Sequence, residues 1–189
     1  MNQQLSKTRI LTEGAIMVAL GTVLSMLKVF DLPMGGGVTL CAMLPIVLIA
    51  YRHGVKWGVF TAFVFSVLQL LLGIDNVQYA SSALMALGII LFDYIVAYTV
   101  IGLAGIFKGK FGKPALEIVL GTVLVMFLRF LCHFLTGWVI WDALWPNEFG
   151  LAAPLYSLEY NGSYMLVETI TTSIAAALLV RFADYGKDK

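Results

Sequence analysis

Three ionisable side chains lie deep in apolar runs of the sequence, where their charges or protons could do chemistry. They are Asp93 in LFDYIVAY, and Arg129 and His133 in LRFLCHFLTGWVIW. A charged side chain at the centre of a bilayer costs about 2.5–3.5 kcal/mol on insertion scales, so such groups face a bundle interior and find partners. Together they could act as acid and base, bind a polar solute, or join two helices as a structural ion pair. These residues alone favour the structural and functional interpretations equally.

The arginine and the histidine belong to one stripe along a predicted helix. Arg129, His133, Gly137 and Trp141 follow one another at intervals of four residues. That spacing places them roughly on the same helix face. His133 lies one turn closer to the tryptophan, on the outward side of the arginine. We expect His133 to line a binding site and Arg129 to pair with a carboxylate beneath that site.

Aromatic residues gather near the predicted outer ends of these segments. An interfacial belt explains any single tryptophan or tyrosine there. Aromatic faces combined with one carboxylate, an imidazole and an amide also suit a flat cationic heterocycle. Cation–π contact contributes about 0.5–2 kcal/mol when the ring is desolvated, and hydrogen bonds from His or Asn fix the orientation of the ligand. The aromatic residues are Tyr94, Trp138, Trp141, Trp145, Tyr156, Tyr160 and Tyr164.

The composition assigns these residues to a membrane protein. Of the 189 residues, 60% are hydrophobic and only 12% are charged, and the mean hydropathy is +0.92. The charged share is about half that of soluble domains. A water-soluble protein of this size could not bury so much apolar surface, and several runs reach the ~20 residues that cross a bilayer as a helix. The sequence therefore predicts an all-α integral membrane protein.

The hydropathy pattern predicts one domain over residues 1–189, built as a single bundle of six membrane helices. The second segment is short, so part of the preceding Gly-rich stretch is expected to enter the membrane. A polar and aromatic loop over residues 142–163 is expected before the last helix, and no cleavable signal peptide is predicted. The predicted segments are Ile10–Phe30, Cys41–Tyr51, Trp57–Leu72, Ala83–Phe107, Ala115–Trp141 and Tyr164–Phe182.

Charge sorts the connecting loops onto two sides of this arrangement. Ten of the 12 Lys and Arg residues fall on one side, and only Lys28 lies near the other. The positive-inside rule then places both termini in the cytoplasm. An acidic outer face favours a cationic solute over an anionic one. The acidic residues on the outer side are Asp31, Asp75, Asp142, Glu148 and Glu159.

The remaining acidic and sulfur groups have simpler interpretations. Glu13 and Glu117 fall in the first turns of their segments, where we expect solvated carboxylates near helix N-termini. Glu168 lies about one turn into the last predicted segment, and either a structural or a functional role fits it. Cys41 and Cys132 are expected to be buried thiols that act as small hydrophobes rather than a disulfide.

Motifs for several common chemistries are missing from the sequence. There is no G-x-x-x-x-G-K-[ST], no H-E-x-x-H and no G-x-S-x-G. Cysteine and histidine do not recur at metal-ligand spacing. We therefore expect no catalytic residue, no metal, no cofactor, no ATP hydrolysis and no nucleic-acid partner for this chain.

Small residues on the first predicted helix could receive a partner helix. Ala15 and Ala19 lie four residues apart in EGAIMVALGT. Such small-xxx-small patterns let two helices approach closely in lipid. Packing within the bundle is the more frequent use of the pattern, and docking of another protein is the alternative.

Four stretches in the same order resemble the thiamine-specific S-components of energy-coupling-factor (ECF) transporters, the ThiT/YuaJ type. They are PMGGGVTLCAMLPIVLIAYRHGVKWG, LFDYIVAY, LRFLCHFLTGWVIW and LYSLEYNGSY. The resemblance covers nearly the whole chain. It implies a six-helix bundle in the bacterial plasma membrane that captures the vitamin from outside. Delivery would require a shared transmembrane subunit and two cytoplasmic ATPase subunits, because the S-component itself hydrolyses nothing.

The resemblance also implies roles for individual residues. Ala15 and Ala19 would dock on the shared transmembrane subunit. Family members can have Glu where this chain has Asp93, and the shorter side chain keeps the charge but changes its reach. The fourth helix, the fifth helix, the last loop and the start of the sixth helix would line an outer pocket. The implied ligand-binding residues are Asp93, Tyr94, His133, Trp141, Tyr156 and Asn161.

Three other interpretations stay open from the sequence. The chain could be an S-component for another vitamin or precursor, such as riboflavin or a hydroxymethylpyrimidine. It could be a small intramembrane enzyme that uses Asp93, Arg129 and His133 as acid and base groups. It could also be a scaffold subunit without a ligand, in which these three residues only join helices.

Overall fold

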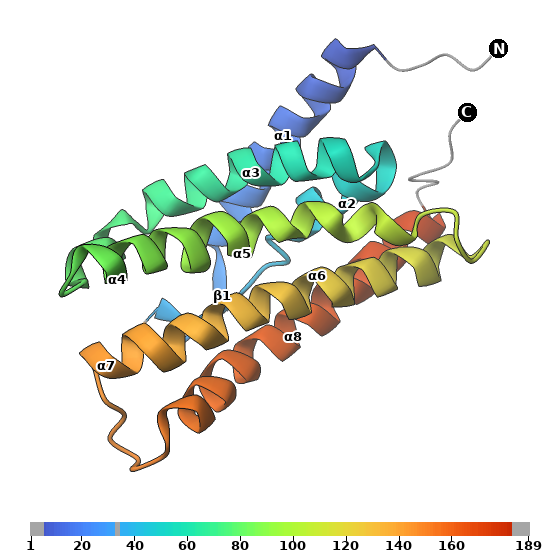
Figure 1. The fold of residues 1–189 in the computed structure, drawn as a ribbon. Helices are drawn as coiled ribbons and strands as arrows, with labels where there is room; N and C mark the ends of the chain where they lie inside the picture. The colour runs from blue at the N-terminus through green and yellow to red at the C-terminus, as the bar shows by residue number, and fades with distance from the viewer. Residues whose placement is uncertain (1–5, 33–34, 183–189) are drawn as a thin grey trace.

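The computed structural model describes residues 6–32 and 35–182 of the chain. Five helices in this part are long and apolar enough to cross a membrane. Figure 1 shows four of them lying along one another, with α1 crossing behind α3. The protein is therefore an α-helical membrane protein, as the composition predicts. The five helices are α1 (Lys7–Met26), α3 (Val55–Leu72), α4 to η4 (Ala83–Phe107), α6 to α7 (Pro114–Leu144) and α8 (Ala153–Phe182).

Two of these long helices change their winding along their length. Each contains a π-helical turn, and one of these turns carries Asp93 while the other ends at Trp141. Single π turns inside α-helices occur frequently at functional sites. A 3₁₀-helix, η2 (Ile74–Tyr79), connects α3 to α4. The segments of the two helices are α4 (Ala83–Gly88), η3 (Ile89–Ile95), α5 (Val96–Thr99), η4 (Val100–Phe107), α6 (Pro114–Thr136), η5 (Gly137–Trp141) and α7 (Asp142–Leu144).

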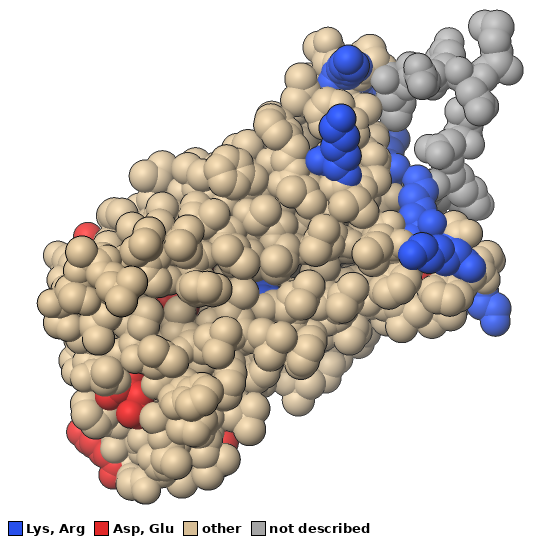
Figure 2. Space-filling view, viewed as in Figure 1, with Lys and Arg blue, Asp and Glu red and all other residues tan. Residues whose placement is uncertain are grey.

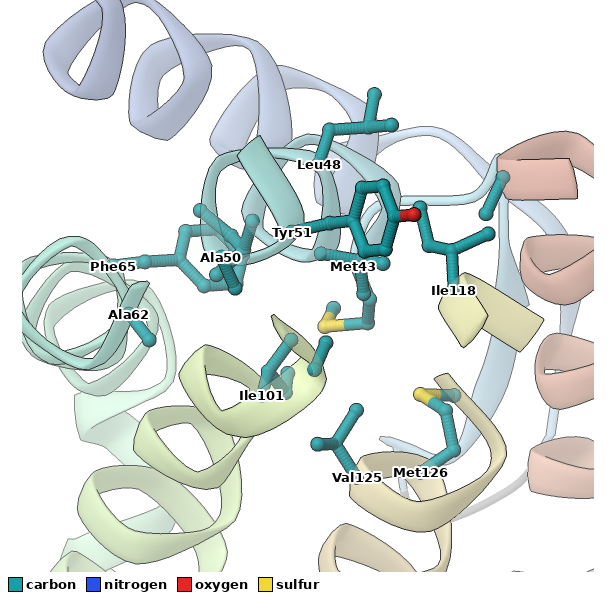
Figure 3. Close-up of a cluster of buried hydrophobic side chains, with 14 of the residues drawn as sticks. Met43, Leu48, Ala50, Tyr51, Ala62, Phe65, Ile101, Ile118, Val125 and Met126 are labelled. Carbon is teal, nitrogen blue, oxygen red and sulfur yellow. The ribbon is translucent and has the colours of Figure 1, made fainter. Parts of the chain in front are cut away.

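The second predicted segment is a short helix in the middle of the core. With ten residues, α2 (Leu44–His53) is about 15 Å long, half of the roughly 30 Å that a membrane helix must cross. All residues from Pro45 to Tyr51 are buried, which suits a helix that is apolar on every side. Figure 3 shows Ala50 and Tyr51 among side chains from α3, η4 and α6.

A two-stranded antiparallel ribbon, which the sequence did not predict, precedes α2. It pairs β1 (Lys28–Asp31) with β2 (Gly37–Thr39). The Thr39 backbone N–H and hydroxyl donate to Oε1 of Glu168 in α8, at 2.9 and 2.5 Å. The Gly36 N–H donates to the Tyr160 hydroxyl at 2.9 Å. The stretch before α2 therefore contacts α8 as a ribbon, and its entry into the membrane, expected because the second segment is short, stays a prediction.

The last helix begins earlier than predicted. Residues 153–163 were expected to form a loop, but α8 starts at Ala153 and continues to Phe182. The prediction was wrong because this part of the helix buries polar side chains such as Ser157 and Asn161, so it lacks an apolar stripe. Glu168 consequently lies in the middle of α8 and is only 3% exposed.

Opposite ends of the bundle carry opposite charge. Figure 2 shows Lys and Arg at the end where α1 begins and α8 ends, and Asp and Glu at the other end. The basic turns after α2 and after η4 lie at the first of these ends, near the start of α1 (Figure 1). Lys187 and Lys189, which belong to the predicted basic side, lie outside the described residues, as do both termini.

Glu117 is buried, which contradicts the prediction of a solvated carboxylate. Its side chain is 2% exposed. It accepts hydrogen bonds from the backbone N–H groups of Gly109 and Phe111, both at 2.8 Å, and from the Tyr51 hydroxyl at 3.2 Å. The prediction failed because the turn between η4 and α6 folds over the carboxylate and supplies these donors. Glu117 therefore holds that basic turn against α2.

Glu13 is only partly solvated, because it connects α1 to the end of α2. One carboxylate oxygen lies 2.9 Å from Arg52 Nη1, and the other lies 3.0 Å from His53 Nε2. The Glu13 side chain is 18% exposed. The carboxylate is thus less solvated than expected, because Arg52 and His53 cover it at the edge of the bundle.

Replacing Glu117 with alanine should lower the stability of the fold. The variant leaves two backbone N–H groups and a tyrosine hydroxyl without their acceptor, a loss of about 2–3 kcal/mol. We expect a lower melting temperature in detergent than for the wild-type protein. Glu148, an exposed acidic residue near the opposite end, provides the control: Glu148→Ala should melt like the wild type. Equal melting of both variants would show that the Glu117 contacts do not stabilise the fold.

Candidate ligand-binding site

The carboxylate of Asp93 is the centre of the candidate site. Asp93 is 8% exposed. Nε1 of Trp141 donates to one carboxylate oxygen at 2.8 Å. Nδ1 of His133 lies 3.1 Å from the other oxygen, which also accepts a hydrogen bond from the Thr136 hydroxyl. These three contacts compensate for the hydration that a buried carboxylate loses.

Three helix segments position these groups. Asp93 lies in the π-helical turn η3, and Trp141 ends the π-helical turn η5. His133 and Thr136 lie in the last turn of α6, directly before η5. Because a π turn contains an extra residue, it rotates the side chains that follow relative to an unbroken α-helix. The turn thereby brings the indole N–H of Trp141 to the same carboxylate as the imidazole of His133.

His133 carries a polar atom that the protein does not use. Nδ1 faces Asp93, whereas Nε2 is buried and has no hydrogen-bond partner among the described residues. The imidazole packs against the ring of Tyr98 in an edge-to-face arrangement, with 6.4 Å between ring centroids. A buried polar atom without a partner is uncommon in folded proteins. Nε2 is therefore a hydrogen-bonding group without a protein partner in the described part of the chain, and its contact with a ligand stays a prediction.

A cluster of aromatic rings extends from Trp141 toward the acidic end of the bundle. The rings of Trp141 and Trp145 are stacked, with an interplanar angle of 9° and a centroid separation of 5.7 Å. Tyr79 contacts Trp145 edge-on at 4.9 Å. This packing fixes the plane of the Trp141 indole, so the site presents an aromatic face in a defined orientation.

The amide of Asn161 joins α8 to α6 beside the site. Asn161 is 5% exposed, and its Nδ2 donates to the backbone oxygen of His133 at 3.3 Å and to the hydroxyl of Ser157 at 3.2 Å. The Tyr164 hydroxyl donates to its Oδ1 at 3.0 Å. Tyr156 lies on the same helix, with its ring 6.1 Å from that of Tyr160. Both predicted residues thus lie on α8, because this helix includes the predicted loop.

Tyr94 is directed away from the groups around Asp93. Its hydroxyl donates to the backbone oxygen of Gly73 at 2.9 Å and lies 2.8 Å from Nδ2 of Asn76. The side chain is 8% exposed. Tyr94 therefore connects η3 to the junction between α3 and η2, and its role in ligand binding stays a prediction.

Arg129 pairs with Glu168, one helical turn below His133. Its Nη1 lies 2.8 Å from a carboxylate oxygen of Glu168. Its Nη2 lies 3.3 Å from the Tyr98 hydroxyl, and the guanidinium lies 4.8 Å from the centroid of the Tyr98 ring. Sequence reasoning predicted a carboxylate partner for Arg129 but did not identify it, because the last helix was placed too late in the chain.

Comparison with known proteins identifies the family. The family model described as thiamine transporter protein (Thia_YuaJ) matches residues 11–186. The chain belongs to this family. The thiamine transporter ThiT of Bacillus subtilis (strain 168) is 32% identical over 190 residues, which cover 95% of this chain and 93% of that protein. ThiT of Lacticaseibacillus paracasei is 30% identical over 155 residues, with 75% and 72% covered.

A solved structure of a ThiT protein has the same fold. The protein comes from Listeria monocytogenes and superposes with a TM-score of 0.77 at 23% sequence identity. The match covers 94% of this chain and 96% of the other. The overall helix arrangement in Figure 1 is therefore shared with that protein.

The deep ionisable groups of this Thia_YuaJ-family protein form two separate sets. Asp93 contacts His133, whereas Arg129 contacts Glu168. An acid–base enzyme would direct its three groups at one reacting atom, so this division disfavours the enzyme interpretation. The family relatives are named as transporters. Among the described residues, no group of three or more His, Cys, Asp or Glu side chains could hold a metal ion.

Sequence reasoning missed Thr136 and Glu168 as members of these sets. Thr136 follows His133 by three residues and so shares its helix face. It was missed because threonine is common in membrane helices and carries no charge. Glu168 was recognised as ambiguous, but its pairing depends on the true start of α8.

A glycine at the contact between α6 and α8 allows the site to form. A Cβ atom added to Gly137 would lie 2.3 Å from the Ser157 hydroxyl and 3.0 Å from Asn161 Nδ2. A Cβ on Gly162 of α8 would meet only Phe130, at 4.0 Å. The two glycines therefore differ in the space around them, although both lie within helices.

Gly137→Ala should separate α6 from α8, whereas Gly162→Ala should not. Overpacking costs about 1–3 kcal/mol, while both variants gain the same helix propensity of about 1 kcal/mol. We expect Gly137→Ala to melt at a lower temperature in detergent than Gly162→Ala. Equal melting temperatures would mean that the helices can move apart at Gly137 without loss.

Proposed function

We propose that this chain is the thiamine-binding S-component of an ECF transporter in the bacterial plasma membrane. It captures extracellular thiamine and delivers it through a shared transmembrane subunit and two cytoplasmic ATPase subunits. The observation that carries the proposal is the buried Asp93 carboxylate, held by three side chains beside the unpartnered Nε2 of His133. A permanent cation with hydrogen-bonding groups, such as thiamine, satisfies both features. The chain itself needs no metal or cofactor for this function.

Each site residue then has a physical role toward thiamine. Asp93 compensates for the charge of the thiazolium ring. The rings of Trp141 and Tyr156 offer stacking surfaces, each worth about 0.5–2 kcal/mol when desolvated. His133 and Asn161 exchange hydrogen bonds with the pyrimidine or the hydroxyethyl group. Tyr94, the remaining residue of the predicted set, would act indirectly, because its hydroxyl holds η3, which carries Asp93, against the junction between α3 and η2.

The proposed orientation has six passes and places both termini in the cytoplasm. The ribbon of β1 and β2 together with the ten-residue α2 makes the short second pass. The basic end of the bundle (Figure 2) then faces the cytoplasm by the positive-inside rule. Asp93 and the aromatic cluster lie toward the acidic end, so the site opens to the outside.

Helix α1 is proposed to dock on the shared transmembrane subunit. Gly14 and Val18 are buried against the bundle, whereas Ala15 and Ala19 are exposed on a different face of the helix. Small residues allow a partner helix to approach closely in lipid. Gly14, which is buried, packs within the bundle, whereas the two exposed alanines are free of such packing and remain accessible to a partner helix.

Thiamine should bind to the purified protein and quench its tryptophan fluorescence. Asp93→Asn should weaken binding at least tenfold, because it removes the counter-charge, about 1.4 kcal/mol or more. Fluorescence titration and calorimetry measure both values. Asp75→Asn, which neutralises an exposed acid at the same end, is the matched control and should bind like the wild type.

Two results would contradict this proposal. A wild-type protein that gives neither quench nor heat at micromolar thiamine does not bind it. An unchanged affinity in Asp93→Asn would remove Asp93 from the site. Mass spectrometry of the molecule that copurifies with the protein separates thiamine from another vitamin or precursor, since each has a distinct mass.

Ala15→Trp should bind thiamine normally but lose uptake in cells that also make the shared transmembrane subunit and the two ATPase subunits. A tryptophan at the exposed alanine blocks the close approach of a partner helix. Leu20→Trp, at another exposed position of α1, should keep both binding and uptake. Radiolabelled thiamine uptake measures the difference, and normal transport by Ala15→Trp would rule out docking through this face.

A further inference from the structure

The Arg129–Glu168 pair has no role in the proposed binding of thiamine, although it lies close to the site. Both side chains are enclosed, at 7% and 4% exposure, and their charged atoms are 2.8 Å apart. Arg129 is the one buried Lys or Arg in residues 6–32 and 35–182. Its Nε is also buried and lacks a hydrogen-bond partner within those residues. A buried cation with an unused donor would be suited to bind an anion if Glu168 did not occupy it.

Tyr98 places this pair next to the site. The Arg129 guanidinium lies 4.8 Å from the centroid of the Tyr98 ring. The same ring packs edge-on against the imidazole of His133, at 6.4 Å. Arg129 also precedes His133 by one turn on α6. One aromatic ring therefore separates the guanidinium from the wall of the site.

The charges of the two sets together suit a ligand with one positive charge. Asp93 and Glu168 each contribute one negative charge and Arg129 one positive charge, so the sum is one negative charge when the imidazole is counted as neutral. Charges interact more strongly in such an enclosed region than in water. A monocation neutralises the sum. A phosphate ester of the same cation carries a phosphate of about −1.5 to −2, so its net charge is negative and the site repels it.

We propose that Glu168 determines the specificity of the site for the free cation over its phosphate ester. By pairing with Arg129, it withholds from the ligand a cation that would otherwise attract phosphate. This inference rests on the proposed function, because it takes thiamine as the free cation and thiamine monophosphate as the ester.

Glu168 also has a structural role, which the test must separate from the electrostatic one. Its second oxygen accepts the N–H and the hydroxyl of Thr39, so a change at this position could disturb the ribbon. Disturbance of the ribbon would weaken binding of both ligands alike. The informative quantity is therefore the ratio of the two dissociation constants, the value for the ester divided by the value for thiamine.

Four variants test the inference. E168Q keeps the shape but exposes the charge of Arg129, and it should lower the ratio at least tenfold. E168D restores a carboxylate and should keep a ratio close to that of the wild type. R129M/E168M removes both charges, so the net charge is unchanged and the ratio should stay within threefold of wild type. E13Q is the control, because it neutralises the Glu13 carboxylate, which pairs with Arg52 at 2.9 Å and lies far from the site. This variant should leave the ratio unchanged.

Calorimetry with thiamine and thiamine monophosphate on each purified protein gives these ratios. The inference is overturned if the wild type binds both ligands equally, if E168Q keeps the wild-type ratio, or if R129M/E168M lowers the ratio as E168Q does. Even where E168Q is too unstable to purify, because an unpaired buried arginine destabilises a fold, the inference stays open to refutation: a wild type that binds both ligands equally, or a double variant with a lowered ratio, overturns it. Failure of the proposed function is distinguishable, because the wild type would then not bind thiamine at all.

Discussion

A charge inside an apolar helix bundle must be compensated by the protein, and the centre of this molecule is arranged around that requirement. Asp93 is compensated by side chains of α6 and η5. Arg129 is compensated by Glu168 across the α6–α8 contact. Glu117 is compensated by backbone N–H groups of the turn before α6. Asp93 and Arg129 therefore each join two different helices. Glu117 joins α6 to the turn that precedes it and, through the Tyr51 hydroxyl, to α2.

The packing of the helices follows from the short reach of these contacts. A hydrogen bond from Asn161 to the backbone of His133 requires α8 to approach α6 closely, and Gly137 leaves the room for it. The ribbon before α2 likewise depends on an acceptor in α8, because Glu168 binds both the N–H and the hydroxyl of Thr39. Apolar burial supplies most of the contact area (Figure 3), but it is not directional. The polar contacts determine which helix faces meet.

Much of this architecture could be predicted from the sequence, and the failures have one physical cause. The helices α3, α4 to η4 and α6 were predicted within a few residues because long apolar runs are unambiguous. The first turns of α8 and the ribbon were missed because their polar groups are satisfied by distant residues, which no local pattern reveals. In the site, too, local patterns were predicted and contacts between distant residues were missed. Helical spacing selected His133 and Trp141, and their contact with Asp93 is seen in the structure, whereas the pairing of Arg129 with Glu168 depends on two separate helices.

The site is largely satisfied before any ligand enters, and this bears on how it would bind thiamine. The carboxylate of Asp93 already has three partners, and the Trp141 indole is fixed both by that carboxylate and by stacking on Trp145. A ligand therefore finds a preorganised aromatic face and spends little free energy on ordering side chains. The short side chain of Asp93 holds its carboxylate against Thr136 and Trp141. In the proposed complex its charge would act on the ligand through the enclosed medium, where the attraction between two charges at a given distance is stronger than in water. The Asp93 carboxylate thus orients the Trp141 indole, and in the proposed complex it would also supply the counter-charge.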